Sequence, residues 1–124
     1  MAVMAMDSGC VESALRKIFL VAAVVTIAGL FYLGGKPVAV GLFPPAMDKV
    51  AHFVTFGLIA ALLSLSMPKP RPWLVVMFVA VVGAADEIHQ LYLPGRSASL
   101  NDFVTDALAA VFVVIALECA RRYR

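Results

Sequence analysis

Residues 86–106 read DEIHQLYLPGRSASLNDFVTD. The stretch begins inside one hydrophobic segment and ends inside the next, and Pro94 and Gly95 near its middle predict a turn between the two. An ionisable group within a membrane span usually faces a protein interior or a wet cavity and has a partner there. The stretch therefore predicts two packed helices that share a polar site at one end. Its charged or imidazole-bearing residues are Asp86, Glu87, His89, Arg96, Asp102 and Asp106.

The composition of the whole chain predicts an integral membrane protein. Hydrophobic residues make up 63% of the 124 and charged residues only 15%, whereas a soluble domain is about half apolar and about a quarter charged. The mean hydropathy is +0.97. We therefore expect an all-α bundle of four transmembrane helices in a single membrane domain over residues 1–124. The expected spans, each of about 20 residues, are residues 14–35, 46–67, 73–93 and 100–120. A net charge of +2 gives no reason to expect a nucleic-acid partner.

The basic residues predict how the spans are oriented. Of the 10 lysines and arginines, all but three fall at the chain ends or in the loop between the second and third spans, which share one side of a four-span protein. Cytoplasmic segments carry an excess of Lys and Arg, so both termini are expected in the cytoplasm. The three on the opposite side are Lys36, Lys49 and Arg96.

Polar side chains recur at helical spacing near the outer ends of the last three spans. Residues three or four apart lie on one helix face. At a rise of about 1.5 Å per residue, His52, Asp86 and Asp106 reach similar depths, about 9–10 Å below the outer ends of their helices. We therefore expect one polar pocket that opens outward. The groups are Asp48 with His52, then Asp86 with His89 and Gln90, then Asp102 with Asp106.

The pocket residues suit binding of a phosphate or acid–base chemistry. The planar fork of Arg96 fits phosphate oxygens, and Lys49 adds a second cation. A histidine oriented by a carboxylate is a common general acid or base. The candidates for catalysis are His52, His89, Asp48 and Asp86, and the expected ligand-binding residues are Lys49, Gln90, Arg96, Asp102 and Asp106.

A metal site and a purely structural cluster are the alternatives. Asp86, His89, Asp102 and Asp106 could hold a divalent cation, but neither they nor Cys10 and Cys119 have the spacing of a metal motif. We therefore expect no metal and no cofactor. Polar pairs can also join helices at about 1 kcal/mol each. Asn101 or Asp102 is expected to cap the fourth helix, and Glu87 to point toward a neighbouring helix, the headgroups or solvent.

At these residues the chain resembles the VanZ-like family of small membrane proteins. The matching pieces occur in the family's order between about Met47 and Ala110: DKVAHF at 48–53, DEIHQ at 86–90, PGR at 94–96, and Asp102. The family pattern then has an asparagine and a glycine where this chain has Asp106 and Ala109. This departure weighs against a role that needs a neutral amide or a close backbone approach at those positions.

The resemblance implies a role at the bacterial cell envelope, in the cell membrane, since the family's name comes from a member tied to resistance to the glycopeptide teicoplanin. Three functions stay open for this chain. It could bind or modulate an anionic envelope lipid or a lipid-linked wall precursor, with the headgroup phosphate at Arg96 and Lys49. It could be a hydrolase or transferase acting on a phosphate-bearing lipid. It could be a structural or assembly partner, and a homo-oligomer is compatible with all three.

Overall fold

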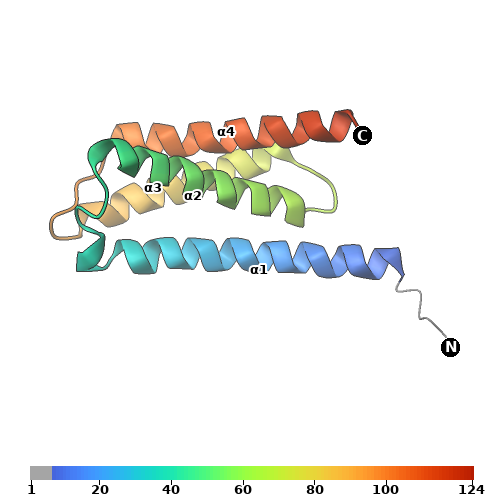
Figure 1. Cartoon of the computed structure of the whole chain (residues 1–124), viewed down its shortest axis with the longest axis horizontal. Helices are drawn as coiled ribbons and strands as arrows, with labels where there is room; N and C mark the ends of the chain where they lie inside the picture. The colour runs from blue at the N-terminus through green and yellow to red at the C-terminus, as the bar shows by residue number, and fades with distance from the viewer. Residues whose placement is uncertain (1–6) are drawn as a thin grey trace.

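Residues 7–124 fold into four long helices and one short 3-10 helix (Figure 1). The computed structural model describes residues 7–124. The long helices are apolar and packed together, which confirms the expected all-helical class. Their bounds are α1 Ser8–Gly34, α2 Pro45–Ser66, α3 Pro72–Leu91 and α4 Leu100–Arg122, and the 3-10 helix η1 is Pro37–Ala39.

Local capping interactions explain where the helices begin. The side chain of Asp7 accepts a hydrogen bond from the backbone N–H of Gly9 at 3.3 Å, so α1 begins well before the expected span. Proline occupies the first turn of α2 and α3, where its missing N–H costs nothing. The cap of α4 is Ser99, whose Oγ accepts from the N–H of Asp102 at 3.3 Å. The prediction that Asn101 or Asp102 caps this helix was therefore wrong.

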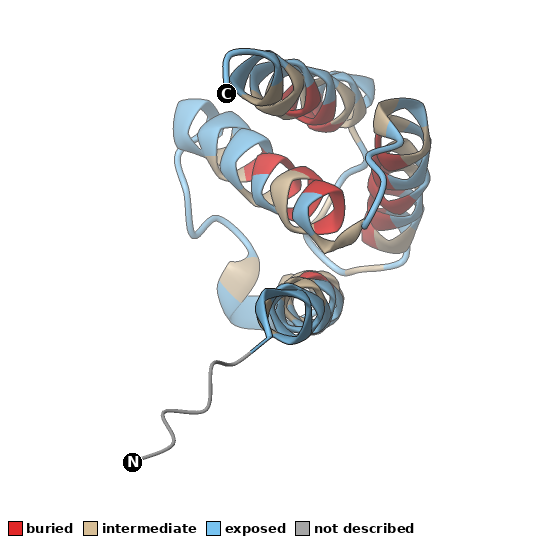
Figure 2. Ribbon diagram, turned by 90° about the vertical axis from the view of Figure 1, so that its right-hand side faces the viewer, coloured by how far each residue is buried: buried red, intermediate tan, exposed pale blue. Residues whose placement is uncertain are grey.

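The buried core lies where α2, α3 and α4 meet. Figure 2 shows their buried faces turned toward one another, with α1 lying outside them and mostly exposed. Helix α1 packs chiefly on α2, and Ala23 is its one fully buried residue among those described. The core consists mainly of residues with side chains of moderate size: Phe56, Ile59, Ala60, Leu63, Val75, Val79, Val82, Ala109, Ala110 and Val114, together with Ala23.

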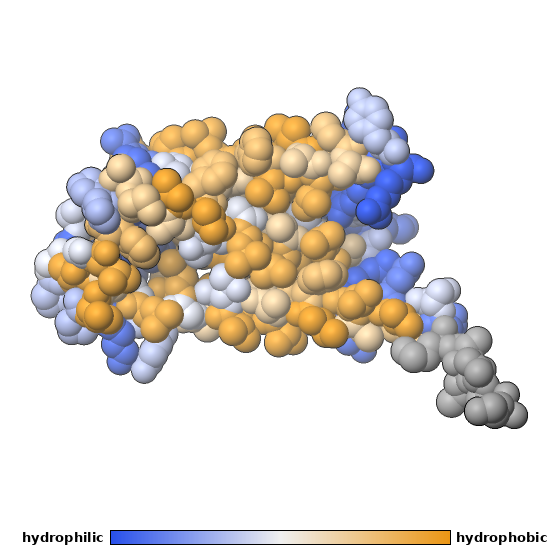
Figure 3. All heavy atoms as spheres, in the orientation of Figure 1, coloured by the Kyte–Doolittle hydropathy of each residue, from blue (hydrophilic) through white to orange (hydrophobic). Residues whose placement is uncertain are grey.

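All four long helices are long and apolar enough to cross a membrane. Large hydrophobic side chains such as Val25, Val81 and Phe112 are more than half exposed on the outside of the bundle. Figure 3 shows these apolar surfaces as a broad belt between more hydrophilic ends. In water such a surface would be unfavourable, whereas lipid tails solvate it. The chain is a multi-pass membrane protein whose four spans contact the bilayer.

The loops divide between the two ends of the bundle. The start of α1, the C-terminus and the α2–α3 loop lie at one end, and the α1–α2 and α3–α4 loops lie together at the other (Figure 1). The turn of the α3–α4 loop requires Gly95, whose φ is +75°. A Cβ at Gly95 would also lie only 3.1 Å from Cγ1 of Val40, so the two loops are in contact. The predicted site residues lie toward this loop end.

Candidate functional site

Two polar pairs join α2 to α4 one turn apart. Lys49 Nζ lies 3.2 Å from Asp102 Oδ1, and His52 Nδ1 lies 2.9 Å from Asp106 Oδ1. The spacing of three residues on α2 and four on α4 places both pairs on the facing sides of the two helices. The structure therefore brings together four of the predicted residues, in two side-chain pairs that connect α2 and α4.

The inner pair, His52 and Asp106, is enclosed by protein. The Asp106 side chain has no exposed surface and that of His52 is 9% exposed, whereas the Lys49 side chain of the outer pair is half exposed. Gly83 of α3 makes room for the carboxylate, since a Cβ there would lie 3.1 Å from Asp106 Oδ2. Helices α3 and α4 therefore approach each other closely beside Asp106, at Gly83.

Glu87 belongs to the same buried region, which the sequence did not reveal. Its Oε2 accepts a hydrogen bond from the backbone N–H of Ser99 at 2.6 Å, and the residue is only 7% exposed. It therefore points toward the start of a neighbouring helix, one of the expected directions, and is not a solvated surface residue. Ser99 was also missed. The pattern Ser99-x-x-Asp102 is typical of a helix start and could have identified it.

The polar face predicted for α3 divides in two. Gln90 Nε2 donates to Asp86 Oδ2 at 3.0 Å, and both residues are buried. His89 instead lies against α1, with its ring centroid 5.5 Å from that of Phe31. His89 Nδ1 is buried and has no hydrogen-bond partner among residues 7–124. The two candidate general acids or bases therefore have different neighbours, since His52 bonds to Asp106 of α4 and His89 lies beside Phe31 of α1.

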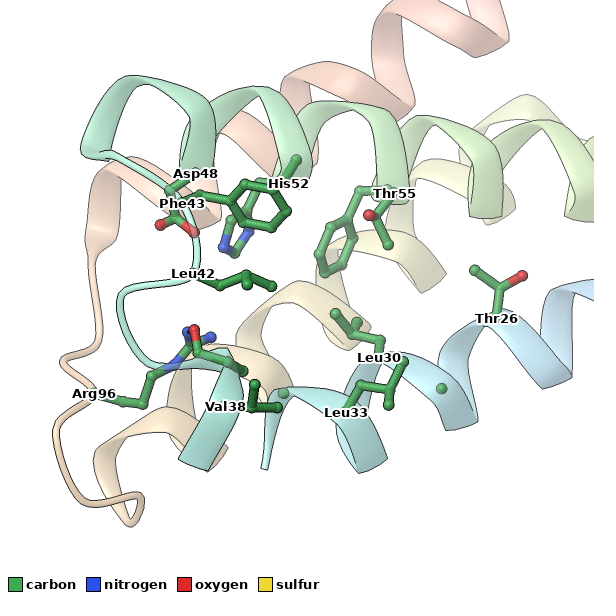
Figure 4. Close-up of a pocket in the computed structure, with 15 residues that line it drawn as sticks. Thr26, Leu30, Leu33, Val38, Leu42, Phe43, Asp48, His52, Thr55 and Arg96 are labelled. Carbon is green, nitrogen blue, oxygen red and sulfur yellow. The ribbon is translucent and has the colours of Figure 1, made fainter. Parts of the chain in front are cut away.

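A pocket of about 540 Å³ lies between α1, α2 and the loop end of the bundle. Figure 4 shows Asp48, His52 and Arg96 grouped at one end of it, with apolar side chains from α1 and the α1–α2 connection continuing away from them. The polar groups thus occupy one end of a largely hydrophobic cavity. Its apolar lining includes Leu30, Leu33, Val38, Leu42, Phe43 and Phe56.

Arg96 is the cation of this pocket. Its Nη1 donates to the backbone carbonyl of Ala39 at 3.2 Å, which ties the α3–α4 loop to η1. Its Nε is buried without a hydrogen-bond partner, and no carboxylate in the described part of the chain forms a salt bridge with it. Lys49, by contrast, is paired with Asp102. Asp48 also lines the pocket and makes its field less positive.

These residues support binding and two kinds of chemistry, although the roles predicted for them stay predictions. The guanidinium of Arg96 can donate two parallel hydrogen bonds to an anion. His52 is held through Nδ1 by Asp106, the arrangement in which a carboxylate orients a general acid or base. Donor atoms of His52, Glu87 and Asp106 lie within 4.8 Å of one another, as do those of Asp48, His52 and Asp102. The metal-binding set considered from the sequence, which included Asp86 and His89, is not among these groups.

Comparison with known proteins adds one match. The protein-family model described as VanZ/LLP1 matches residues 9–121, nearly the whole chain. No curated protein and no solved structure is significantly similar to it.

Proposed function

Since this chain belongs to the VanZ/LLP1 family of membrane proteins, we propose that it binds an anionic lipid of the bacterial cell envelope in the pocket between α1 and α2. The observation that carries the proposal is Arg96, a guanidinium at the polar end of an apolar cavity that pairs with no carboxylate of residues 7–124. A ligand that fits both parts has an anionic head and a hydrocarbon tail. Membrane phospholipids and lipid-linked wall precursors share that chemistry.

The headgroup phosphate is proposed to lie against Arg96. A buried guanidinium N–H without an acceptor is unfavourable, and a phosphate oxygen would satisfy the free Nε of Arg96. Bidentate contact with a guanidinium also distinguishes phosphate from a neutral headgroup. Asp48 faces the same space, so a headgroup that also carries a hydroxyl or amine would suit the pocket better than inorganic phosphate.

The tail of the lipid is proposed to follow the apolar part of the cavity along α1. Leu30 and Leu33 line this part, and Gly29 leaves it open because nothing lies within 4 Å of a Cβ built there. Burial of each methylene group contributes about 0.8 kcal/mol when it leaves water. A tail that is already in the bilayer gains less, so the headgroup contact should determine which lipid is selected.

We place this pocket at the outer side of the bacterial cell membrane, with both termini in the cytoplasm. The distribution of lysine and arginine supports this orientation. On the outer side, the pocket would meet wall precursors after their export. A link to teicoplanin resistance stays a prediction of the family resemblance.

Native mass spectrometry of the purified protein tests the proposal. Wild type should retain an anionic lipid from the membrane. Arg96→Lys keeps the charge but loses the fork, and Gly29→Leu fills the cavity, so each should reduce lipid retention by about tenfold or more, equivalent to about 1.4 kcal/mol. Melting temperatures should stay close to that of wild type.

Two matched controls make the result specific. Arg71→Lys is the same substitution at an exposed position at the other end of the bundle, and Ala28→Leu places the same final side chain on the exposed side of α1. Both should retain lipid as wild type does. Equal retention by Arg96→Lys and Arg71→Lys would contradict the role of Arg96, and equal retention by Gly29→Leu and Ala28→Leu would contradict the position of the tail.

A hydrolase or transferase acting on a phosphate-bearing lipid is the second candidate. The hydrogen bond between His52 and Asp106 favours it, because His52 also lines the pocket. The same spectra distinguish the two functions when a labelled lipid is added. Binding alone leaves the mass of the lipid unchanged, whereas an enzyme releases a product of altered mass, and His52→Gln should abolish that product.

A further inference from the structure

We propose that His52, Glu87 and Asp106 form a binding site for one divalent transition-metal ion in the centre of the bundle. This inference goes beyond the proposed lipid binding and does not depend on it. The three residues come from α2, α3 and α4, and each is at least nine-tenths buried. One ligand atom from each lies within 4.8 Å of the others.

The carboxylate oxygens of this group are incompletely satisfied. Glu87 Oε2 accepts from Ser99, but Glu87 Oε1 is buried and has no hydrogen-bond partner within residues 7–124. Asp106 Oδ1 contacts His52, but Asp106 Oδ2 is likewise buried and unpartnered in that part of the chain. Buried polar atoms are normally paired, so two free oxygens on carboxylates of the same group favour the binding of a positively charged ligand.

The net charge of His52, Glu87 and Asp106 also favours a cation as the ligand. Two carboxylates in a buried space carry more negative charge than a single imidazole can balance, and Asp86 on the adjoining face of α3 is already bonded to Gln90. Burying an unpaired charge is expensive. Lys49 is not available for compensation, because it pairs with Asp102, and no salt bridge in residues 7–124 joins Arg96 to Glu87 or Asp106. A divalent cation would balance both carboxylates at once.

The mixture of donors selects the kind of ion. An imidazole nitrogen with carboxylate oxygens suits Zn²⁺ and its neighbours in the transition series, whereas Mg²⁺ and Ca²⁺ prefer oxygen alone. A tetrahedral Zn²⁺ with bonds of about 2.0 Å holds its ligand atoms about 3.3 Å apart. The separation of 2.9 Å between His52 Nδ1 and Asp106 Oδ1 is already near this value, and a ligand atom of Glu87 lies within 4.8 Å of one on each of these residues. Three protein ligands would leave the fourth position open.

Zinc binding by the purified, untagged full-length protein tests the site. Wild type loaded with ZnCl₂ and desalted should retain one zinc ion per chain by elemental analysis. Glu87→Gln removes a ligand atom with little change in shape, so its zinc affinity, measured by competition with a chromophoric chelator, should fall by about tenfold or more. Asp48→Asn is the control, because Asp48 belongs to the other group around His52, and it should bind zinc as wild type does.

A second measurement covers the case in which Glu87→Gln fails to fold. Co²⁺ bound to wild type in this site should give the visible absorption of a tetrahedral complex, and zinc should displace it and raise the melting temperature. The proposal is overturned if wild type retains no zinc and gives no cobalt spectrum. It is also overturned if Asp48→Asn loses zinc while Glu87→Gln retains it. Lipid retention is measured separately, so failure of either proposal leaves the other intact.

Discussion

Asp106 is the residue on which the loop end of the bundle most depends. It is fully buried, it bonds to His52 across two helices, and it lies against Gly83 of a third. Lys49, one helical turn nearer the loops, makes a similar contact with Asp102, but half of its side chain is exposed. Removing one partner should therefore destabilise the protein more at the inner pair than at the outer pair. Only at the inner pair would the remaining partner stay buried without a counter-charge.

We predict that Asp106→Ala lowers the free energy of unfolding by about 3–5 kcal/mol, since it leaves His52 buried without its partner. Lys49→Ala should cost no more than about 1 kcal/mol, as for other exposed ion pairs. Unfolding in mixed detergent micelles, followed by circular dichroism, measures both. Similar losses for the two variants would show that the inner pair is not enclosed as described.

At the scale of the helices, two glycines set how closely α4 approaches its neighbours. A Cβ at Gly83 of α3 would lie 3.1 Å from Oδ2 and 3.2 Å from Cβ of Asp106, and one at Gly57 of α2 would lie 3.3 Å from Cγ2 of Val113. Asp106 is held in place by its hydrogen bond, whereas the end of the Val113 side chain can turn away. The contact between α3 and α4 is therefore the less tolerant of the two.

Gly83→Ala is expected to destabilise the protein by about 1–3 kcal/mol, the usual cost of overpacking. Gly57→Ala should cost less, and Gly29→Ala, which meets open space, should be neutral or slightly stabilising because alanine favours helix. Thermal melting of the three variants under one condition gives the order. If Gly83→Ala melted no earlier than Gly29→Ala, the close approach of α3 and α4 would be contradicted.

The positions of the helices could be predicted from the sequence, but the direction in which each helix turns its polar residues could not. Long apolar segments between prolines predict the four helices, and the spacing of Asp48 with His52 and of Asp102 with Asp106 predicts which residues share a face. The rotation of each helix depends on contacts with the others. For that reason neither the burial of Glu87 nor the contact of His89 with Phe31 of α1 was foreseen.

At the scale of the whole molecule, the two ends of the bundle differ in chemistry. One end holds the start of α1, the C-terminus and the α2–α3 loop, with most of the basic residues, and the other holds the pocket and the buried polar groups (Figure 1). The bilayer keeps the two ends of the bundle apart, because the apolar belt between the ends must remain within the hydrocarbon core (Figure 3). The orientation then decides which compartment the pocket faces.

We predict that a cysteine introduced at the exposed Ser97 reacts in intact cells with a thiol reagent that cannot cross the membrane. Native Cys10 and Cys119, exposed at the opposite end, should react only after the membrane is opened, because the excess of Lys and Arg places that end inside. A Cys10→Ser, Cys119→Ser background isolates the introduced thiol. Reaction of the native cysteines in intact cells, with none at position 97, would reverse the orientation.

The peripheral position of α1 has a consequence for the size of what the protein can accommodate. Helix α1 forms one wall of the pocket, yet only Ala23 of its described residues is fully buried. A segment with few buried contacts is displaced at low free-energy cost, while the core of α2, α3 and α4 holds the polar groups in place. The volume of about 540 Å³ is therefore that of the pocket with α1 packed against α2, and an outward movement of α1 would enlarge the pocket without disturbing the buried core.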